Sequence, residues 1–244
     1  MNVTIVGDFA DPMSFLASQR VEQITSLELA NIKWLAVESD RLRPMAGRPL
    51  DQATADTVRQ CALPGEIVAT AGVNAPNSRA ASAAYAESLT DGVPDAMRRA
   101  LFDALWVRGQ RVDDPDVIRN IVFRVLNPNP LGDIDARIRA NQPIVPLGDP
   151  EPIATTRQLG FIVSAGRGPL TVDGQRRIDA WAQLWHDHGD LPLPLLLTDL
   201  DEVYTHRRAL QWLAALLPHQ PAPSPEDLPS PGNPVGAVAS LEAV

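Results

Sequence analysis

The chain has 244 residues, of which 45% are hydrophobic and 21% charged, so it can bury a full core as one domain with a large insertion or as two small domains. Its net charge of −9 argues against nonspecific binding to nucleic acids or to anionic membranes. Cys61 is the one cysteine, so the chain can form no internal disulfide and cannot cycle a dithiol by itself.

The sequence also lacks the signals of membrane insertion and of export. No segment approaches the ~20 consecutive apolar residues that a membrane helix needs. The N-terminal residues show no basic region followed by an apolar run, which a signal peptide would have. We therefore expect a cytoplasmic protein that does not interact with membranes.

The beginning of the chain predicts a strand over 2–6, a helix over 13–27 and a second strand over 32–37. The helix should bury one apolar face that includes Leu16 and Leu27. Because the helix is long enough for a crossover, the two strands should be parallel neighbours.

The middle of the chain predicts a block of helices. Asn77 is a candidate cap for one helix, and Asp114 followed by Pro115 is a typical start for another, because Asp caps helices and proline suits the first helical position. Two apolar stretches, 66–70 and 159–163, have a pattern that leaves their structure open. The predicted helices span 51–62, 77–89, 94–107, 133–140 and 171–188, with a further one that starts at 115 and stops before 127.

The end of the chain predicts a strand over 193–198, a hairpin turn at 199–201, a strand over 202–205 and a helix to 217. Beyond it the chain is rich in Pro, Ser and Ala, which is typical of an extended or disordered tail. This order of elements predicts an α/β thioredoxin fold with a large helical insertion. The expected parts are a thioredoxin-like core over 1–43 and 190–217, the insertion over 44–189 and the Pro-rich tail over 218–244.

Three segments carry a family resemblance. The first is Asp8-Phe9-Ala10-Asp11-Pro12-Met13-Ser14-Phe15-Leu16, an acidic residue, a turn and a helix start. The second comprises 76–80, 99–106, 109 and 113–115, and the third comprises 193–199 with Ala209, Leu210 and Leu213. In this order they resemble the Cys-Pro-x-Cys or Ser-Pro-x-Ser turn, the helical insertion and the cis-proline loop of DsbA-like thioredoxin-fold proteins. That branch includes dithiol oxidoreductases, 2-hydroxychromene-2-carboxylate isomerases and kappa-class glutathione transferases.

The resemblance implies roles for particular residues. Asp11 stands at the position of the nucleophilic cysteine, or of the serine that activates a thiol, and Ser14 stands at the second cysteine. Pro194 matches the cis-proline whose backbone would pair with a thiol or peptide substrate. The implied catalytic residues are therefore Asp11 and Ser14. The implied substrate-binding residues are Asp8, Pro12, Met13 and Pro194.

Each of the acidic and hydroxyl residues of this turn has two interpretations. An Asp before a Pro is a good helix N-cap, which contributes roughly 0.5–2 kcal/mol. The same helix start would hold the Asp11 carboxylate ionised, as a permanent anion that pairs with a cation or orients a ligand. Ser14 can donate to a bound thiolate or hydrogen-bond locally. Asp8 can accept a proton or stabilise the turn.

Other residues are weaker candidates. His186 and His188 invite a metal interpretation, but alternate positions of a helix point apart, so we expect no metal site and assign them to the helix dipole. Cys61 should be a small packed hydrophobe. Segment 167–169 either contacts an anionic ligand or forms a simple turn. Tryptophans 106 and 185 belong to the core or line a cleft between core and insertion.

Two functions compete at this point. The first is binding of a small organic ligand or thiol conjugate at the turn, with isomerisation or transfer as the reaction and a low-molecular-weight thiol as candidate cofactor. The second is a non-catalytic interaction module that binds a protein partner through the Pro-rich tail or a helical face. We do not expect disulfide oxidoreductase activity, because a carboxylate cannot perform thiol–disulfide exchange.

Overall fold

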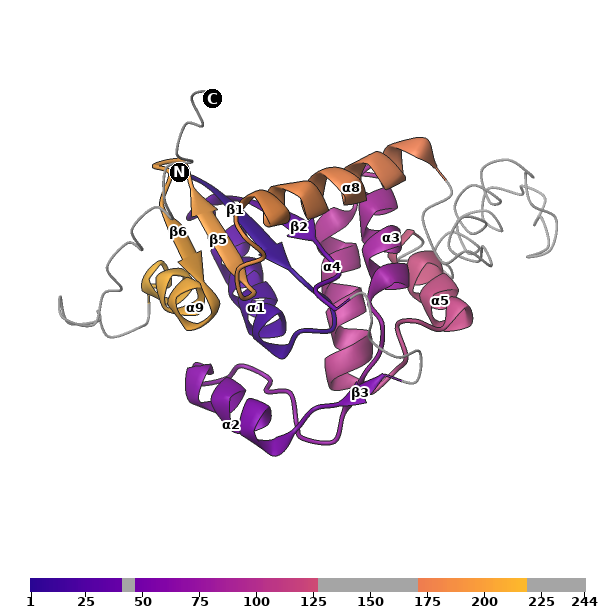
Figure 1. The fold of residues 1–244 in the computed structure, drawn as a ribbon, viewed down its shortest axis with the longest axis horizontal. Coiled ribbons are helices and arrows are strands. Elements are labelled where there is room, and N and C mark those ends of the chain that lie inside the picture. Colours follow the sequence, from indigo (N-terminus) through magenta and orange to yellow (C-terminus); the bar gives the residue numbers. More distant parts are fainter. Residues whose placement is uncertain (41–46, 127–170, 219–244) are drawn as a thin grey trace, which may run out of the picture.

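The computed structural model describes residues 1–40, 47–126 and 171–218, and Figure 1 shows a small sheet with helices around it. The sheet has four strands in the order β2-β1-β5-β6. The central strand β1 runs parallel to β2 and antiparallel to β5, so the first and last parts of the described chain share one sheet. The strands are β1 (Asn2–Gly7), β2 (Asn31–Ala36), β5 (Leu195–Thr198) and β6 (Val203–Thr205).

The register of β1 explains its position in the centre of the sheet. Ile5 pairs with Trp34 of β2 on one side and with Leu196 of β5 on the other. Ile5 and Leu196 are fully buried. A strand that is paired on both edges and covered on both faces is rich in apolar residues at successive positions, as β1 is at its end.

Helix α1 (Pro12–Ser26) makes the crossover from β1 to β2, and the predicted parallel pairing of these strands is confirmed. It packs against α9 (His206–Ala215), the last described helix. Leu16 is buried as expected, but the expectation for Leu27 is wrong, because the helix ends at Ser26 and the Leu27 side chain is 51% exposed at its C-cap.

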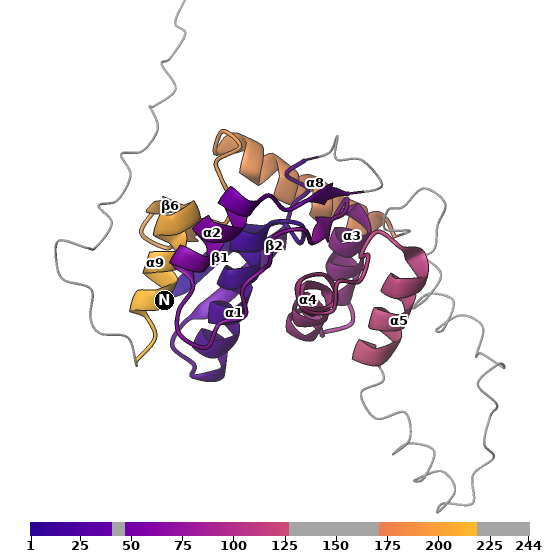
Figure 2. The ribbon, with the colours of Figure 1, turned by 90° about the horizontal axis from the view of Figure 1, so that it is seen from below.

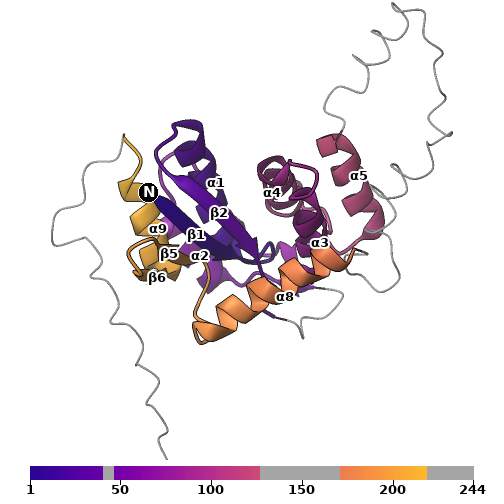
Figure 3. The same ribbon diagram turned by 90° about the horizontal axis from the view of Figure 1, so that it is seen from above.

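The helical part lies beyond β2 in Figure 1, and α8 leads from it back to the sheet, as Figure 3 shows from above. Helix α8 packs against α3 and β2. The predicted helix over 94–107 is confirmed, but its last turn is a π-helix. The elements are α3 (Arg79–Ser88), α4 (Pro94–Phe102), the π-helix η1 (Asp103–Val107), α5 (Pro115–Leu126) and α8 (Val172–Asp187).

Residues 47–75, which we call the arm, hold a short antiparallel pair of strands in a region expected to be helical. Two-residue strands are too short to give a periodic sequence signal. Between them lies α2, which packs against α1 and is seen from below in Figure 2. The elements of the arm are β3 (Arg48–Pro49), α2 (Gln52–Cys61) and β4 (Asn74–Ala75).

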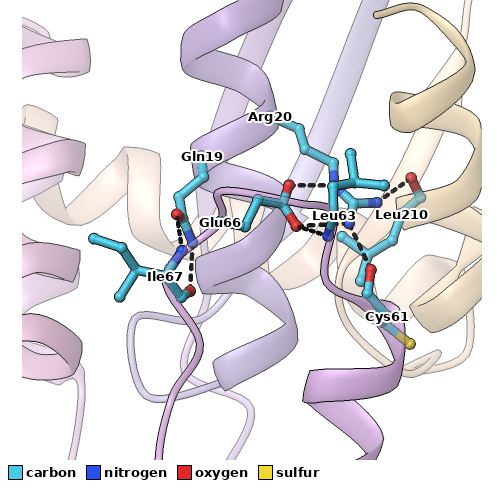
Figure 4. A network of polar contacts seen from close by, with 7 residues as sticks. All are labelled: Gln19, Arg20, Cys61, Leu63, Glu66, Ile67 and Leu210. Atoms are coloured by element: carbon cyan, nitrogen blue, oxygen red, sulfur yellow. Dashed lines mark hydrogen bonds and ion pairs between the residues drawn. The ribbon is translucent and has the colours of Figure 1, made fainter. Parts of the chain in front are cut away.

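A buried polar network ties the arm to the core (Figure 4). Arg20 of α1 donates from Nε and Nη2 to the two carboxylate oxygens of Glu66, at 2.7 and 2.9 Å. It also donates to the carbonyls of Cys61, at the end of α2, and of Leu210 in α9, at 2.6 and 2.5 Å. One side chain thus joins α1, α9 and the end of the arm helix.

Most predicted helix starts agree with the structure. Asp51 caps α2 by accepting the N–H of Thr54 at 2.8 Å, and Asp114 accepts the N–H of Asp116 at 2.8 Å before α5. Asn77 is not the N-cap of α3, although its side chain accepts the N–H of Arg79 at 2.9 Å. The predicted structure at 133–140 and 159–163 and the tail from 219 lie outside the described residues.

Among the described residues, no helix combines the length and the apolar character needed to cross a bilayer.

Candidate functional site

The turn between β1 and α1 presents Asp11 at the start of the helix. The Asp11 N–H donates to the Asp8 carbonyl at 3.1 Å and closes the turn. The Asp11 carboxylate then accepts the N–H of Ser14 at 2.8 Å and that of Met13 at 3.4 Å. Pro12 occupies the first helical position, where no N–H is needed. The N-cap interpretation of Asp11 is confirmed.

Asp11 titrates closer to neutrality than a surface aspartate. Burial raises its pKa from 3.8 to about 6, against the opposing effect of hydrogen bonds from Ser14, and the nearby charge of Asp8 raises it further. The interpretation of Asp11 as an anion therefore applies near neutral pH and not in mildly acidic solution, because the loss of water outweighs the hydrogen bonds at the helix start. Its carboxyl is mostly ionised at neutral pH and takes up a proton in mildly acidic solution.

Ser14 lies behind Asp11 and is fully buried. Its hydroxyl donates to the Asp11 carboxylate at 2.6 Å and accepts the N–H of Asp8 at 3.3 Å. The local hydrogen-bonding interpretation of Ser14 is therefore confirmed. Because its hydroxyl proton is directed at Asp11, Ser14 stabilises that carboxylate.

Gly7 makes room for this arrangement. A Cβ at position 7 would lie 2.4 Å from Cζ2 of Trp34 and 3.2 Å from Oγ of Ser14. Trp34 is 3% exposed and packs edge-on against Phe102 of α4. The absence of a side chain at Gly7 thus lets the indole of β2 lie beside the start of α1.

Asp8 stabilises the turn. It is 1% exposed, and one of its carboxylate oxygens accepts the N–H of Ala10 at 2.8 Å. The other accepts the N–H and the hydroxyl of Ser39, at 2.9 and 2.6 Å. Asp8 therefore ties the turn to the segment that follows β2, in agreement with its turn-stabilising interpretation.

A cleft of about 790 Å³ opens beside Asp11, which is within the usual size of small-molecule sites. One wall comprises the start of α1 and the segment after β2, at 10–12 and 38–40. A second wall is the arm, at 48–51, 54 and 75, and a third runs from Trp185 at the end of α8 to Leu193. The cleft thus lies between the thioredoxin-like sheet, the arm and the last insertion helix.

The lining of the cleft carries charges of both signs. Asp51 on the arm and Asp190 after α8 face it with Asp11, and hydrogen bonds from Thr54 lower the pKa of Asp51. Arg48 on the arm contributes a cation, which lies 3.5 Å from Asp40. Glu38 and Asp40 also line the cleft, so carboxylates outnumber the guanidinium group in its lining.

His206 lines the cleft at the start of α9. Its φ of +51° is a left-handed conformation that costs a residue other than glycine roughly 1–3 kcal/mol. Burial and the neighbouring Arg207 lower the pKa of the imidazole, which favours its neutral form. The sequence pattern did not single out His206, because its place depends on a contact with the loop before β5.

That contact involves the predicted cis-proline. The Leu193–Pro194 peptide bond is cis, and the Pro194 carbonyl accepts the N–H of His206 at 2.9 Å. This carbonyl therefore already has a partner within the chain. The lining of the cleft includes Leu193, whereas Pro194 is buried behind it.

The predicted site residues lie in the turn before α1 and, for Pro194, in the loop before β5, and they have unequal access to the cleft. Asp11 and Pro12 line it. The others are buried and support the turn or the loop from behind. These are Asp8, Met13, Ser14 and Pro194.

The weaker candidates lie apart from Asp11 or support the walls. Burial raises the pKa of the Cys61 thiol, at the far end of α2. Trp185 lines the cleft, whereas Trp106 is buried. His186 pairs with Asp190, and within the described ranges no three His, Cys, Asp or Glu side chains are placed to hold a metal ion. Segment 167–169 lies outside the described residues.

No family model and no curated protein matches the sequence. Solved structures do match the fold. A 2-hydroxychromene-2-carboxylate isomerase is 15% identical with a TM-score of 0.52, over 88% of this chain and 93% of that one. The cytosolic disulfide reductase DsbM from Pseudomonas aeruginosa, solved with GSH, is 14% identical with a TM-score of 0.51, over 88% and 97%.

A third match is a probable DsbA oxidoreductase from Streptomyces coelicolor, 13% identical with a TM-score of 0.53, over 95% of this chain and all of that one. At such identities the likeness is one of fold. The element order, the sheet order and the cis-proline agree with it. The chain has the DsbA-like thioredoxin fold, with its helical insertion, that was expected from the sequence.

Proposed function

We propose that the chain binds a small organic thiol or thiol conjugate in the cleft beside Asp11, without dithiol redox chemistry. The observation that carries this proposal is the cleft itself, which opens on the carboxylate at the position of the family's first cysteine. A protein that had kept the fold only as a scaffold would have no need of an open cleft with charged residues in its lining at this position.

The charges of the lining support an amino acid-like or peptide-like ligand. Asp51 and Asp190 would attract its ammonium group, and Arg48 would attract a carboxylate. A small thiol peptide such as glutathione carries both groups. The solved structure of DsbM with GSH supports the choice of this ligand class.

Asp11 and His206 suit proton transfer. A carboxyl with a pKa near 6 is mostly a base at neutral pH, and it can accept a proton from the ligand and return it to another atom. This is the proton movement that an isomerisation requires, and the fold likeness to an isomerase supports this reaction class. The neutral imidazole of His206 would be the second group able to exchange a proton with the ligand.

The direct test is calorimetric titration with glutathione and with an S-alkyl glutathione conjugate. We expect binding of at least one probe, weakened about tenfold or more by Asp11→Ala, which is about 1.4 kcal/mol. No heat from either probe at millimolar concentration would contradict the proposal.

The chain offers a matched control for the loss of the cap. Asp114 precedes Pro115 as Asp11 precedes Pro12, both aspartates are half-buried, and both cap a helix. Asp114→Ala should therefore lower stability by a similar amount, about 0.5–2 kcal/mol. It should leave ligand affinity unchanged. Equal losses of affinity in the two variants would show that Asp11 acts as a cap alone.

A further inference from the structure

The turn that carries Asp11 is held from the helical part by Trp106. The indole Nε1–H of Trp106 donates to the carbonyl of Phe9 at 3.0 Å. Phe9 is fully buried and Trp106 is 5% exposed, so this bond is made away from water. Leaving this buried carbonyl without its donor would cost about 1–3 kcal/mol, so the Trp106 hydrogen bond stabilises the present conformation of the turn.

The other end of the same peptide unit is also held. The N–H of Ala10, which shares a peptide plane with the Phe9 carbonyl, donates to the Asp8 carboxylate at 2.8 Å. This plane lies in the middle of the turn that the Asp11 N–H closes on the Asp8 carbonyl. Rotation of a central peptide plane is the motion that converts one turn type into another. Trp106 and Asp8 together oppose that rotation.

The π-helix η1 (Asp103–Val107) accounts for the position of Trp106. The Arg108 N–H donates to the Asp103 carbonyl at 3.0 Å, five residues back, instead of four as in an α-helix. The additional residue in this turn shifts Trp106 around the helix relative to a continuous α-helix. Isolated π-turns of this kind are frequent at functional sites.

Aromatic packing supports the same geometry. The Trp106 ring stacks on Phe15 of α1, with a centroid distance of 6.4 Å and an interplanar angle of 21°. One helical turn earlier, Phe102 packs against Phe9 with centroids 4.8 Å apart. The end of α4 and the π-helix therefore contact both the turn and the first turn of α1.

We propose that Trp106 is a positioning residue for the cleft: through the Phe9 carbonyl it fixes the turn and so the place of the Asp11 carboxylate. It touches no ligand itself. Only the effect of Trp106 on ligand affinity rests on the proposed function. Its effect on the position of Asp11 can be measured without a ligand. The helical insertion thus takes part in the site by holding the turn as well as by lining the cleft.

The test is Trp106→Phe, which keeps a ring against Phe15 and removes the N–H donor. Carbon-13 NMR of the aspartate carboxyls follows the titration of Asp11. We expect its pKa to fall from about 6 toward its ordinary value, because a looser turn admits water. The amide N–H groups of Ala10 and Asp11 should exchange with solvent about tenfold faster or more. Affinity for glutathione should fall about tenfold.

Trp212→Phe is the control, because Trp212 belongs to α9 and packs against Tyr204 of the edge strand β6. It removes the same N–H group and should change neither the Asp11 titration nor the turn amides. Trp106→Tyr is a second variant that lacks the indole donor, and it should behave as Trp106→Phe does.

An Asp11 pKa and turn amides unchanged in both Trp106 variants would overturn the inference. If those readouts change while the wild-type protein binds neither thiol probe, the positioning role stands and the proposed function fails.

Discussion

Arg20 and Glu66 form a two-bonded ion pair in which neither side chain is more than 2% exposed. Forty-six residues separate them along the chain, and the pair joins α1 to the segment after α2. Both ends of the arm line the cleft, and this pair, which lies between them in the sequence, fastens the arm to α1. The next residue, Gln19, adds two hydrogen bonds to the backbone of Ile67, at 2.9 and 2.8 Å.

Removing one partner of this pair should be costly. Glu66→Ala leaves the Arg20 charge buried without its carboxylate, which should destabilise the protein by about 3–5 kcal/mol. Unfolding by urea, followed by circular dichroism, measures the loss. Arg20→Met combined with Glu66→Leu removes both charges and should recover part of it, because no unpaired charge is then buried.

A surface pair between α1 and α4 provides the control. Glu22 pairs with Arg99 at 2.7 Å, with both side chains 47% exposed. Glu22→Ala should cost about 0–1 kcal/mol, since exposed ion pairs gain little over water. If Glu66→Ala costs no more than Glu22→Ala, the buried pair does not hold the arm.

The parts of the fold that local rules govern could be predicted from the sequence. An Asp before a Pro marks the start of α1 and of α5, and alternating or helical apolar patterns mark β1, β2 and α8. In the arm, the helix over 51–62 was predicted, but the two strands and the attachment to the core were not. Its strands have two residues each, and its attachment depends on Arg20 and Glu66, whose separation gives no periodic signal.

The location of the candidate site could be predicted from the sequence, but the chemistry of its side chains could not. The turn at Asp11 follows from the order of elements, but the charge state of its carboxyl depends on burial that only the assembled fold provides. Ser14 was a candidate donor to a ligand, and its hydroxyl bonds Asp11 instead. His206 reaches the cleft through the loop at Pro194, a contact between positions that show no pattern.

The titration of Asp11 should make stability depend on pH. Its pKa is raised from 3.8 to about 6 on folding, so between these values the folded state holds more protons than the unfolded state. The extra proton stabilises the folded state at low pH, and this stabilisation is lost as the pH rises through the range. The loss is at most about 3 kcal/mol, because one pKa unit corresponds to about 1.4 kcal/mol. Asp11→Asn has no such proton to lose.

The measurement compares the free energy of unfolding of the wild type and of Asp11→Asn from about pH 4 to about pH 7. Asparagine also caps helices, so the change isolates the charge. We expect the free energy of unfolding of Asp11→Asn to increase relative to that of the wild type as the pH rises. A constant difference between the two proteins across this range would contradict the raised pKa.

Thiol–disulfide exchange should be absent from the isolated chain. Cys61 is the one cysteine, and burial raises the pKa of its thiol, so little reactive thiolate forms near neutrality. Turnover of insulin with a thiol reductant should stay at the uncatalysed rate, and Cys61→Ala should not change it. If the wild type clearly catalysed the reaction and Cys61→Ala did not, the chain would use a monothiol reaction.

Gly7→Ala should destabilise the protein through contact with one side chain. The new Cβ would lie 2.4 and 2.8 Å from Cζ2 and Cη2 of Trp34, so the indole must move, at a cost of about 1–3 kcal/mol. Trp34→Phe removes those two ring atoms and leaves a cavity of its own. Because the added methyl group lies where they were, the double variant should be more stable than the sum of the single losses predicts. Urea unfolding of the four proteins measures this coupling, and strictly additive losses would show that the clash with Trp34 is not the reason for the glycine.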